Sequence, residues 1–156
     1  MKERNDLSNR MLSIKRTFKA PLKLVWEAWT QPEHIAKWWG PQGMKTTVEE
    51  HNFVVGGAWK YTMLMPDGKE FIGEGVYSEI LTFQKIVTSA NFRPMTEGVE
   101  LQILLEETEE GTLFTFHVVH ETEAYCQQQK AMGFYNGWGS TFDRLDGHLM
   151  SLTSSA

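Results

Sequence analysis

The 156-residue sequence predicts an α+β domain in which a curved antiparallel sheet of about seven strands wraps around one long C-terminal helix. Three observations support this fold class. Apolar residues in the last part of the chain recur at steps of three and four, which places them on one face of a helix. Most of the chain before it alternates apolar and polar residues in short runs, roughly 8–14 residues apart, as in a meander. Two short helical segments separate the first run from the others, and this order is the helix-grip arrangement.

The C-terminal helix is expected over residues 132–149. Its predicted apolar face consists of Tyr135, Trp138, Phe142, Leu145 and Leu149. Gly133, Gly137 and Gly139 each lower helix propensity by about 1 kcal/mol. Such residues are kept where a neighbouring backbone comes close or where the helix bends, so the sequence indicates a helix pressed against a sheet.

The first strand is expected at residues 11–19, where polar residues alternate with Leu12, Ile14, Arg16 and Phe18. Arg16 is the anomaly, because it lies on the apolar side. Pro21 suits the first turn of one short helix, and Pro32 suits the first turn of a second, which Gly40 and Pro41 end.

Strands and turns fill residues 44–120. The expected strands lie at residues 44–51, 58–65, 69–81, 85–92, 99–106 and 112–120. Pro66-Asp67-Gly68 is a strong hairpin signal, and residues 93–98 are expected to form a loop. Gly73 and Gly75 suit a bend or bulge in the long strand. Thr122 is expected to cap the final helical region.

No repeat or linker divides the chain, so one domain is expected at residues 11–150, between flexible tails at residues 1–10 and 151–156. The formal net charge of −5 argues against nucleic-acid and anionic-membrane partners. A single cysteine excludes a disulfide framework, and no apolar run reaches the ~18 residues that span a bilayer. The five histidines do not assemble a metal site, and no cofactor motif is present. We therefore expect a cytoplasmic protein without a metal or cofactor.

Several motifs follow one another in a recognisable order. They are Ala20-Pro21, Val25-Trp26, Trp38-Trp39-Gly40-Pro41, Gly56-Gly57 before Trp59, Gly75-Val76-Tyr77, and Phe142-Asp143-Arg144-Leu145. Together they resemble, over residues 12–149, the domain named for activators of the Hsp90 ATPase, in which Leu is commoner than Phe before the aspartate. That family belongs to the START-like, Bet v 1-like (SRPBCC) group. The resemblance implies a helix-grip fold and commonly a hydrophobic ligand, and in the co-chaperones a chaperone partner and a role in stress response.

Arg16 is the first candidate site residue, because a buried guanidinium needs a partner. It is expected either to anchor the carboxylate or polar head of a ligand, or to pair with an internal acid such as Glu74 or Glu121. A position at the strand edge, open to water, is the third alternative.

Aromatic rows on the strands are the second candidate site. One row is Trp59, Tyr61 and Met63, and another includes Phe116 and His120. Both should face Trp138 and Phe142 of the long helix, where they either line a cavity or fill the core. Trp38 and Trp39 cannot both point inward from a short helix, so one is expected at a pocket mouth or on the surface; packing on the long helix is the alternative.

The function expected first is binding of a small hydrophobic or aromatic molecule between sheet and helix. A protein-interaction module of the co-chaperone kind is the alternative. A cyclase- or hydrolase-like enzyme is the third alternative. Glu79, Glu121 and Asp143 are its candidate catalytic acids, and no sequence feature favours one of them. Monomer and homodimer both remain open.

Overall fold

One antiparallel sheet contains all seven strands, in the order β1-β7-β6-β5-β4-β3-β2. The computed structural model describes residues 10–40, 43–93, 96–131 and 133–154. The strands are β1 Met11–Phe18, β2 Lys45–His51, β3 Ala58–Leu64, β4 Glu70–Leu81, β5 Lys85–Arg93, β6 Thr96–Thr108 and β7 Gly111–Val119. The helices are α1 Leu22–Thr30, α2 Pro32–Trp38, α3 Glu123–Ala131 and α4 Phe134–Ser154. The predicted helix-grip fold is confirmed.

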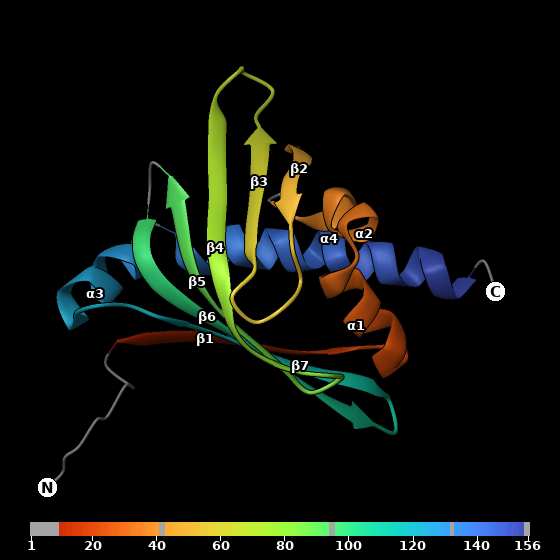
Figure 1. Ribbon diagram of the computed structural model, residues 1–156. Coiled ribbons are helices and arrows are strands. Elements are labelled where there is room, and N and C mark those ends of the chain that lie inside the picture. Colours follow the sequence, from red (N-terminus) through yellow and green to blue (C-terminus); the bar gives the residue numbers. More distant parts are fainter. Residues whose placement is uncertain (1–9, 41–42, 94–95, 132, 155–156) are drawn as a thin grey trace, which may run out of the picture.

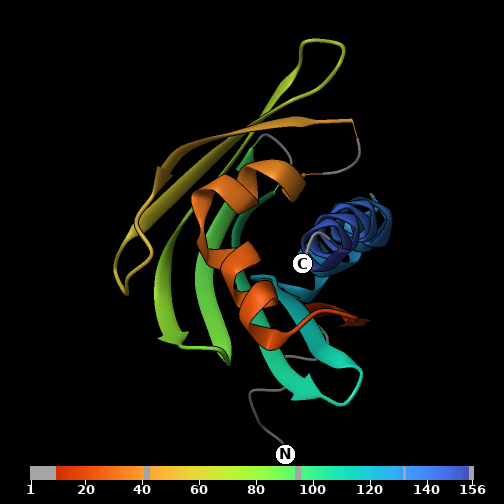
Figure 2. The ribbon, with the colours of Figure 1, turned by 90° about the vertical axis from the view of Figure 1, so that its right-hand side faces the viewer.

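The sheet curves around α4 (Figure 2), and α1 and α2 follow β1 as two short helices (Figure 1). Neighbours in the sheet are also neighbours in the chain, except where β1 joins the end of the meander. There Met11 pairs with Val119 and Phe18 with Thr112. Of the tails expected at residues 1–10 and 151–156, residues 1–9 and 155–156 lie outside the described residues, and residues 151–154 belong to α4, which ends at Ser154.

Aromatic rings join the sheet to α4. The ring of Phe142 lies 4.9 Å from that of Phe114 and 5.0 Å from that of Phe116, and all three side chains are buried. Trp29 of α1 stacks on Phe114 at 5.7 Å. These rings share one core because the inward row of β7 meets the apolar faces of α1 and α4.

The final helical region is two helices rather than one. Gly133 separates them with a φ of +102°, a conformation that glycine adopts without steric cost. The Thr122 cap is confirmed, since its Oγ1 accepts the Tyr125 amide at 3.0 Å. Because α4 starts after Gly133, its buried face begins at Phe134, and the predicted place of Tyr135 on that face is wrong: Tyr135 is 45% exposed.

Two further local predictions are corrected. The loop expected at residues 93–98 is shorter, because β5 continues to Arg93 and β6 starts at Thr96. The β4–β5 irregularity falls between Tyr77 and Glu79, rather than at the two glycines. Gly75 instead makes room for close packing, since a Cβ there would lie 1.9 Å from the Ser89 carbonyl oxygen and 2.9 Å from the Trp59 ring.

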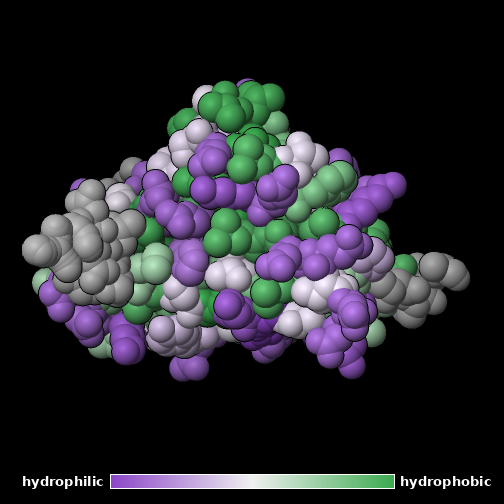
Figure 3. Space-filling view, turned by 90° about the horizontal axis from the view of Figure 1, so that it is seen from below, coloured by the Kyte–Doolittle hydropathy of each residue, from purple (hydrophilic) through white to green (hydrophobic). Residues whose placement is uncertain are grey.

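The surface mixes hydrophilic and hydrophobic groups, which gather in small patches on the face that Figure 3 shows. Among the residues that the structure describes, no helix combines the length and the apolar character needed to cross a bilayer.

Candidate functional site

A pocket of about 360 Å³ lies between the sheet and the start of α4. Its sheet wall includes Met63 of β3, Phe71 of β4 and Phe92 of β5. Its helical wall includes Gln129, Gly133, Phe134, Gly137, Trp138 and Thr141, and the remaining lining is Trp39, Gly40, Met44 and Met65. Every one of these side chains is uncharged, and most are apolar.

Strand register brings the sheet wall together. Met63 is paired with Thr46 of β2 on one side and with Phe71 of β4 on the other. Phe92 is paired with Gly73, whose missing Cβ would lie 3.2 Å from the Phe92 ring. The glycine therefore lets a large ring lie flat over the neighbouring strand and reach the pocket.

The two adjacent tryptophans are both buried, so the expectation that they cannot both point inward is wrong. Of the two places expected for one of them, a pocket mouth or the surface, the surface is excluded. Trp38 ends α2 and its indole donates to the Ala28 carbonyl at 2.8 Å. Trp39 has an extended backbone, with φ −67° and ψ 134°. Because α2 ends at Trp38, the two side chains extend from the backbone in different directions, and both are buried. Trp39 alone of the pair lines the pocket.

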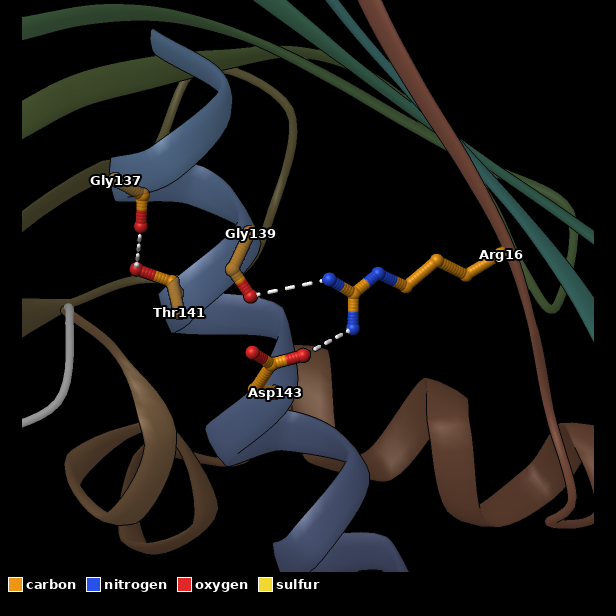
Figure 4. Close-up of polar contacts among 5 residues, drawn as sticks. All are labelled: Arg16, Gly137, Gly139, Thr141 and Asp143. Atoms are coloured by element: carbon orange, nitrogen blue, oxygen red, sulfur yellow. Dashed lines mark hydrogen bonds and ion pairs between the residues drawn. The ribbon is translucent and has the colours of Figure 1, made fainter. Parts of the chain in front are cut away.

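Arg16 lies outside the pocket lining. Its guanidinium donates to the Asp143 carboxylate at 2.8 Å and to the Gly139 carbonyl at 3.1 Å, both on α4 (Figure 4). The side chains of Arg16 and Asp143 are 29% and 64% exposed. The acid that pairs with Arg16 is thus neither Glu74 nor Glu121, and Gly139 leaves room for the guanidinium, which approaches within 3.7 Å of a Cβ built there.

The other predicted site residues divide between pocket and core. Trp138 lines the pocket, and its ring lies 5.9 Å from that of Trp39 and 4.6 Å from that of Phe116. Phe116 and Phe142 are fully buried in the core behind it. His120 is also buried, but it lies outside the pocket lining. Its ring nitrogen Nδ1 donates to the carbonyl of Arg10, the residue before β1, at 3.1 Å. Burial lowers the pKa of His120.

Trp59 and Tyr61 lie outside the pocket lining and contact a smaller interior cavity, and Tyr61 belongs to a polar chain. The Tyr61 hydroxyl contacts His51 Nδ1 at 2.8 Å, and His51 Nε2 contacts the Thr30 carbonyl at 2.7 Å. Since a carbonyl only accepts, His51 Nε2 carries the proton and Tyr61 donates to Nδ1. Burial raises the pKa of Tyr61 far above its usual value and raises the pKa of Tyr77 to about 12.

Most of the pocket lining escaped the sequence reasoning, which predicted only Trp39, Met63 and Trp138 as site residues. The missed residues are Gly40, Met44, Met65, Phe71, Phe92, Gln129, Gly133, Phe134, Gly137 and Thr141. Met65 continues the alternation of Trp59, Tyr61 and Met63, which is a signal that could have found it. Phe134 follows the Gly133 break, and only the true start of α4 reveals its direction.

Two histidines that looked isolated in the sequence meet in the fold. Nδ1 of His34, on α2, lies 2.8 Å from Nε2 of His148, on α4. Burial, followed by the charges of His34 and Lys37, lowers the pKa of His148. Within the described ranges no cluster of three or more His, Cys, Asp or Glu side chains could hold a metal ion.

Comparison with known proteins agrees with the overall fold. A family model described as Activator of Hsp90 ATPase homolog 1-like protein matches residues 19–150. A crystal structure of a Nitrosomonas europaea protein is similar at a TM-score of 0.82 and 27% identity, covering 94% of this chain and 98% of that one. A solution structure of a protein from Arthrobacter aurescens is similar at a TM-score of 0.84 and 27% identity, covering 95% of this chain and 90% of that one. An AHSA1-like protein from Aeromonas hydrophila shares the fold, at a TM-score of 0.75, 22% identity and coverage of 92% and 94%. No curated protein matches the sequence.

Proposed function

Because the chain belongs to the family of Activator of Hsp90 ATPase homolog 1-like proteins, we propose that it uses this fold to bind a small, uncharged, apolar or aromatic molecule. One observation carries the proposal: the pocket between the sheet and α4 has a volume of about 360 Å³. That volume lies within the range of about 300–1,000 Å³ typical of small-molecule sites.

The chemistry of the lining selects the class of ligand. Aromatic rings such as Trp39 and Trp138 offer flat apolar surface, and three methionines offer flexible side chains that adapt to a ligand's shape. A charged ligand group would lose its hydration without meeting an opposite charge among the described residues of the lining, all of which are uncharged. The ligand is therefore neutral along the part that the pocket encloses.

Gly137 offers a direct test, because it lines the pocket and a Cβ built there meets nothing within 4 Å. Gly137→Leu would fill the pocket without a clash at the Cβ. Gly147→Leu is the matched control: Gly147 is another glycine of α4, it is exposed, and a Cβ there also meets nothing within 4 Å. Both substitutions improve helix propensity, so only the pocket distinguishes them.

The neutral fluorescent probe N-phenyl-1-naphthylamine reports binding by its increase in emission. We expect it to bind the wild type and the Gly147→Leu variant equally, and the Gly137→Leu variant about tenfold or more weakly, as for overpacking of a filled site. Mass spectra of the purified protein under native conditions would reveal a ligand that it already carries. Equal binding by all three proteins would place the probe elsewhere and would refute the pocket as the site.

A co-chaperone-like interaction module is the second candidate. The description of the family favours it, and so does an apolar patch made of Val54, Val55 and Val76, which are 53%, 63% and 45% exposed. The test is stimulation of the ATPase of an Hsp90-type chaperone by the wild type, compared with Val55→Lys. Stimulation that Val55→Lys abolishes would favour this candidate, and no stimulation by the wild type would remove it.

A further inference from the structure

One buried donor in the core lacks an acceptor. The indole Nε1–H of Trp29 has no hydrogen-bond partner, although only 5% of this residue is exposed. Buried polar groups are almost always paired, because an unpaired donor gives up its hydrogen bond to water and gains nothing in return. This donor therefore indicates that a further molecule supplies an acceptor.

Trp29 lines a small interior cavity of about 20 Å³. Its other lining residues include Trp39, Trp59, Tyr61 and Tyr77. A volume of this size holds one group as large as a water molecule. The space next to Trp29 thus fits a single polar atom, such as a carbonyl oxygen, and excludes a ring.

The neighbouring polar groups already have partners, which identifies what the cavity lacks. The Trp59 indole donates to Thr88 Oγ1 at 2.8 Å. The Tyr61 hydroxyl is engaged with His51 at 2.8 Å. The Tyr77 hydroxyl is hydrogen-bonded to Tyr61. Among the described polar groups of this lining, the Trp29 indole is the donor that remains, so the missing group is an acceptor rather than a second donor.

Trp39 connects this cavity to the ligand pocket. It lines both spaces, and its ring lies 6.1 Å from that of Trp29 and 5.9 Å from that of Trp138. The Trp39 side chain is therefore a wall that the two spaces share, and a shift of this one side chain would bring them together. The surroundings are aromatic, so a charged leading atom would be strongly disfavoured.

We infer that the cavity beneath Trp39 is the polar subsite of the ligand pocket, and that Trp29 Nε1 donates a hydrogen bond there to a neutral carbonyl-type oxygen of the ligand. This inference rests on the proposed function, since it assigns a polar end to the same ligand. It predicts a preference for ketones, aldehydes or amides over hydrocarbons of the same shape.

A pair of isosteric probes tests the inference: the ketone 2-acetylnaphthalene and the hydrocarbon 2-ethylnaphthalene. Titrations followed by ¹⁵N-resolved NMR of the indole groups observe up to six tryptophan signals. The Trp29 signal is the one that disappears in Trp29→Phe. The Trp38 and Trp59 indoles, which already donate to protein acceptors, serve as internal references.

We expect both probes to shift the signals of Trp39 and Trp138, and only the ketone to move the Trp29 proton downfield. The wild type should bind the ketone about 2- to 10-fold more tightly than the hydrocarbon, the worth of one hydrogen bond. Trp29→Phe should bind both equally. If this variant does not fold, the Trp29 signal is assigned in the wild type by its nuclear Overhauser contacts to the Phe114 ring, which stacks on Trp29 at 5.7 Å, and the wild-type signals then decide the matter.

Other outcomes separate the two proposals. Equal binding of both probes with an unmoved Trp29 signal would leave the ligand pocket standing and would overturn the subsite. A Trp29 signal that exchanges with an internal water and stays unchanged by the ketone would overturn it as well. Failure of both probes to bind would contradict the proposed function itself.

Discussion

Asp143 and Arg144 are neighbours on α4, yet they hold two different parts of the fold. The Asp143 carboxylate accepts a hydrogen bond from Arg16 of β1 at 2.8 Å. The Arg144 guanidinium donates to the carbonyls of Lys37, Trp39 and Gly40 at 3.1, 3.2 and 2.9 Å. Consecutive residues on a helix point about 100° apart, so one short motif fastens α4 to the sheet and to the end of α2.

Arg144→Met should destabilise the protein by about 1–3 kcal/mol, because carbonyls at the end of α2 lose a charged donor while the aliphatic stem is kept. Urea unfolding followed by circular dichroism measures the change. A loss below about 0.5 kcal/mol would mean that water replaces the guanidinium without cost.

Asp143→Asn should have a smaller effect, about 0.2–1 kcal/mol, because the Arg16–Asp143 pair is partly exposed to water. Arg16→Met is the companion variant and should lose a similar amount. Since Arg16 lies outside the pocket lining, neither variant should alter the affinity for N-phenyl-1-naphthylamine. A selective loss of acidic ligands in Arg16→Met would restore Arg16 as a ligand anchor.

Phe142→Ala should cost about 3–5 kcal/mol, as expected when a fully buried aromatic ring is removed from a core. Trp138→Ala should cost less, because Trp138 is half-buried at the pocket wall, but it should weaken binding of the naphthylamine probe. Denaturation and fluorescence titration of both variants separate the two effects. The opposite order of stabilities would mean that the centre of the core lies at Trp138.

Acidification should destabilise the protein. The pKa of His148 is lowered from its ordinary 6.5 by burial, by His34 and by Lys37, so the folded state binds fewer protons than the unfolded state. Stability is therefore complete above about pH 6.5 and is lost as the pH falls from there towards the lowered folded pKa. The lowered pKa values of His51, His117 and His120 act in the same direction.

The contribution of His148 can be isolated by comparing unfolding of the wild type and of His148→Gln at pH 7.5 and 5.5. The wild type should lose more stability than the variant on acidification. Identical losses would assign the pH dependence to other groups.

The order of elements was predictable because periodicity is local. The apolar residues that alternate in β3 and β7, and those at steps of three and four in α4, lie on the faces that the folded protein buries. The expected face of α4 was wrong only at Tyr135, where Gly133 changes the start of the helix.

The polar contacts that hold the helices in place were not predictable, because they join residues distant in the sequence. Arg16 finds Asp143 only when α4 lies across β1, and His34 finds His148 only when α2 meets α4. The buried Trp38 and Trp39 depend on the residue at which α2 ends. Periodicity indicates which residues turn inward, whereas partners across the fold decide what those residues do there.

The place of β1 in the sheet has a consequence for folding kinetics. The strands β2 to β7 each pair with a neighbour in the chain, so their hairpins close short loops. β1 pairs only with β7, and joining Met11 to Val119 closes a loop that spans 109 of the 156 residues. Because the entropy cost of closure grows with loop length, β1 should dock late, after the meander has formed. During synthesis β1 leaves the ribosome before any other strand, yet it must wait for β7, the last strand to be made.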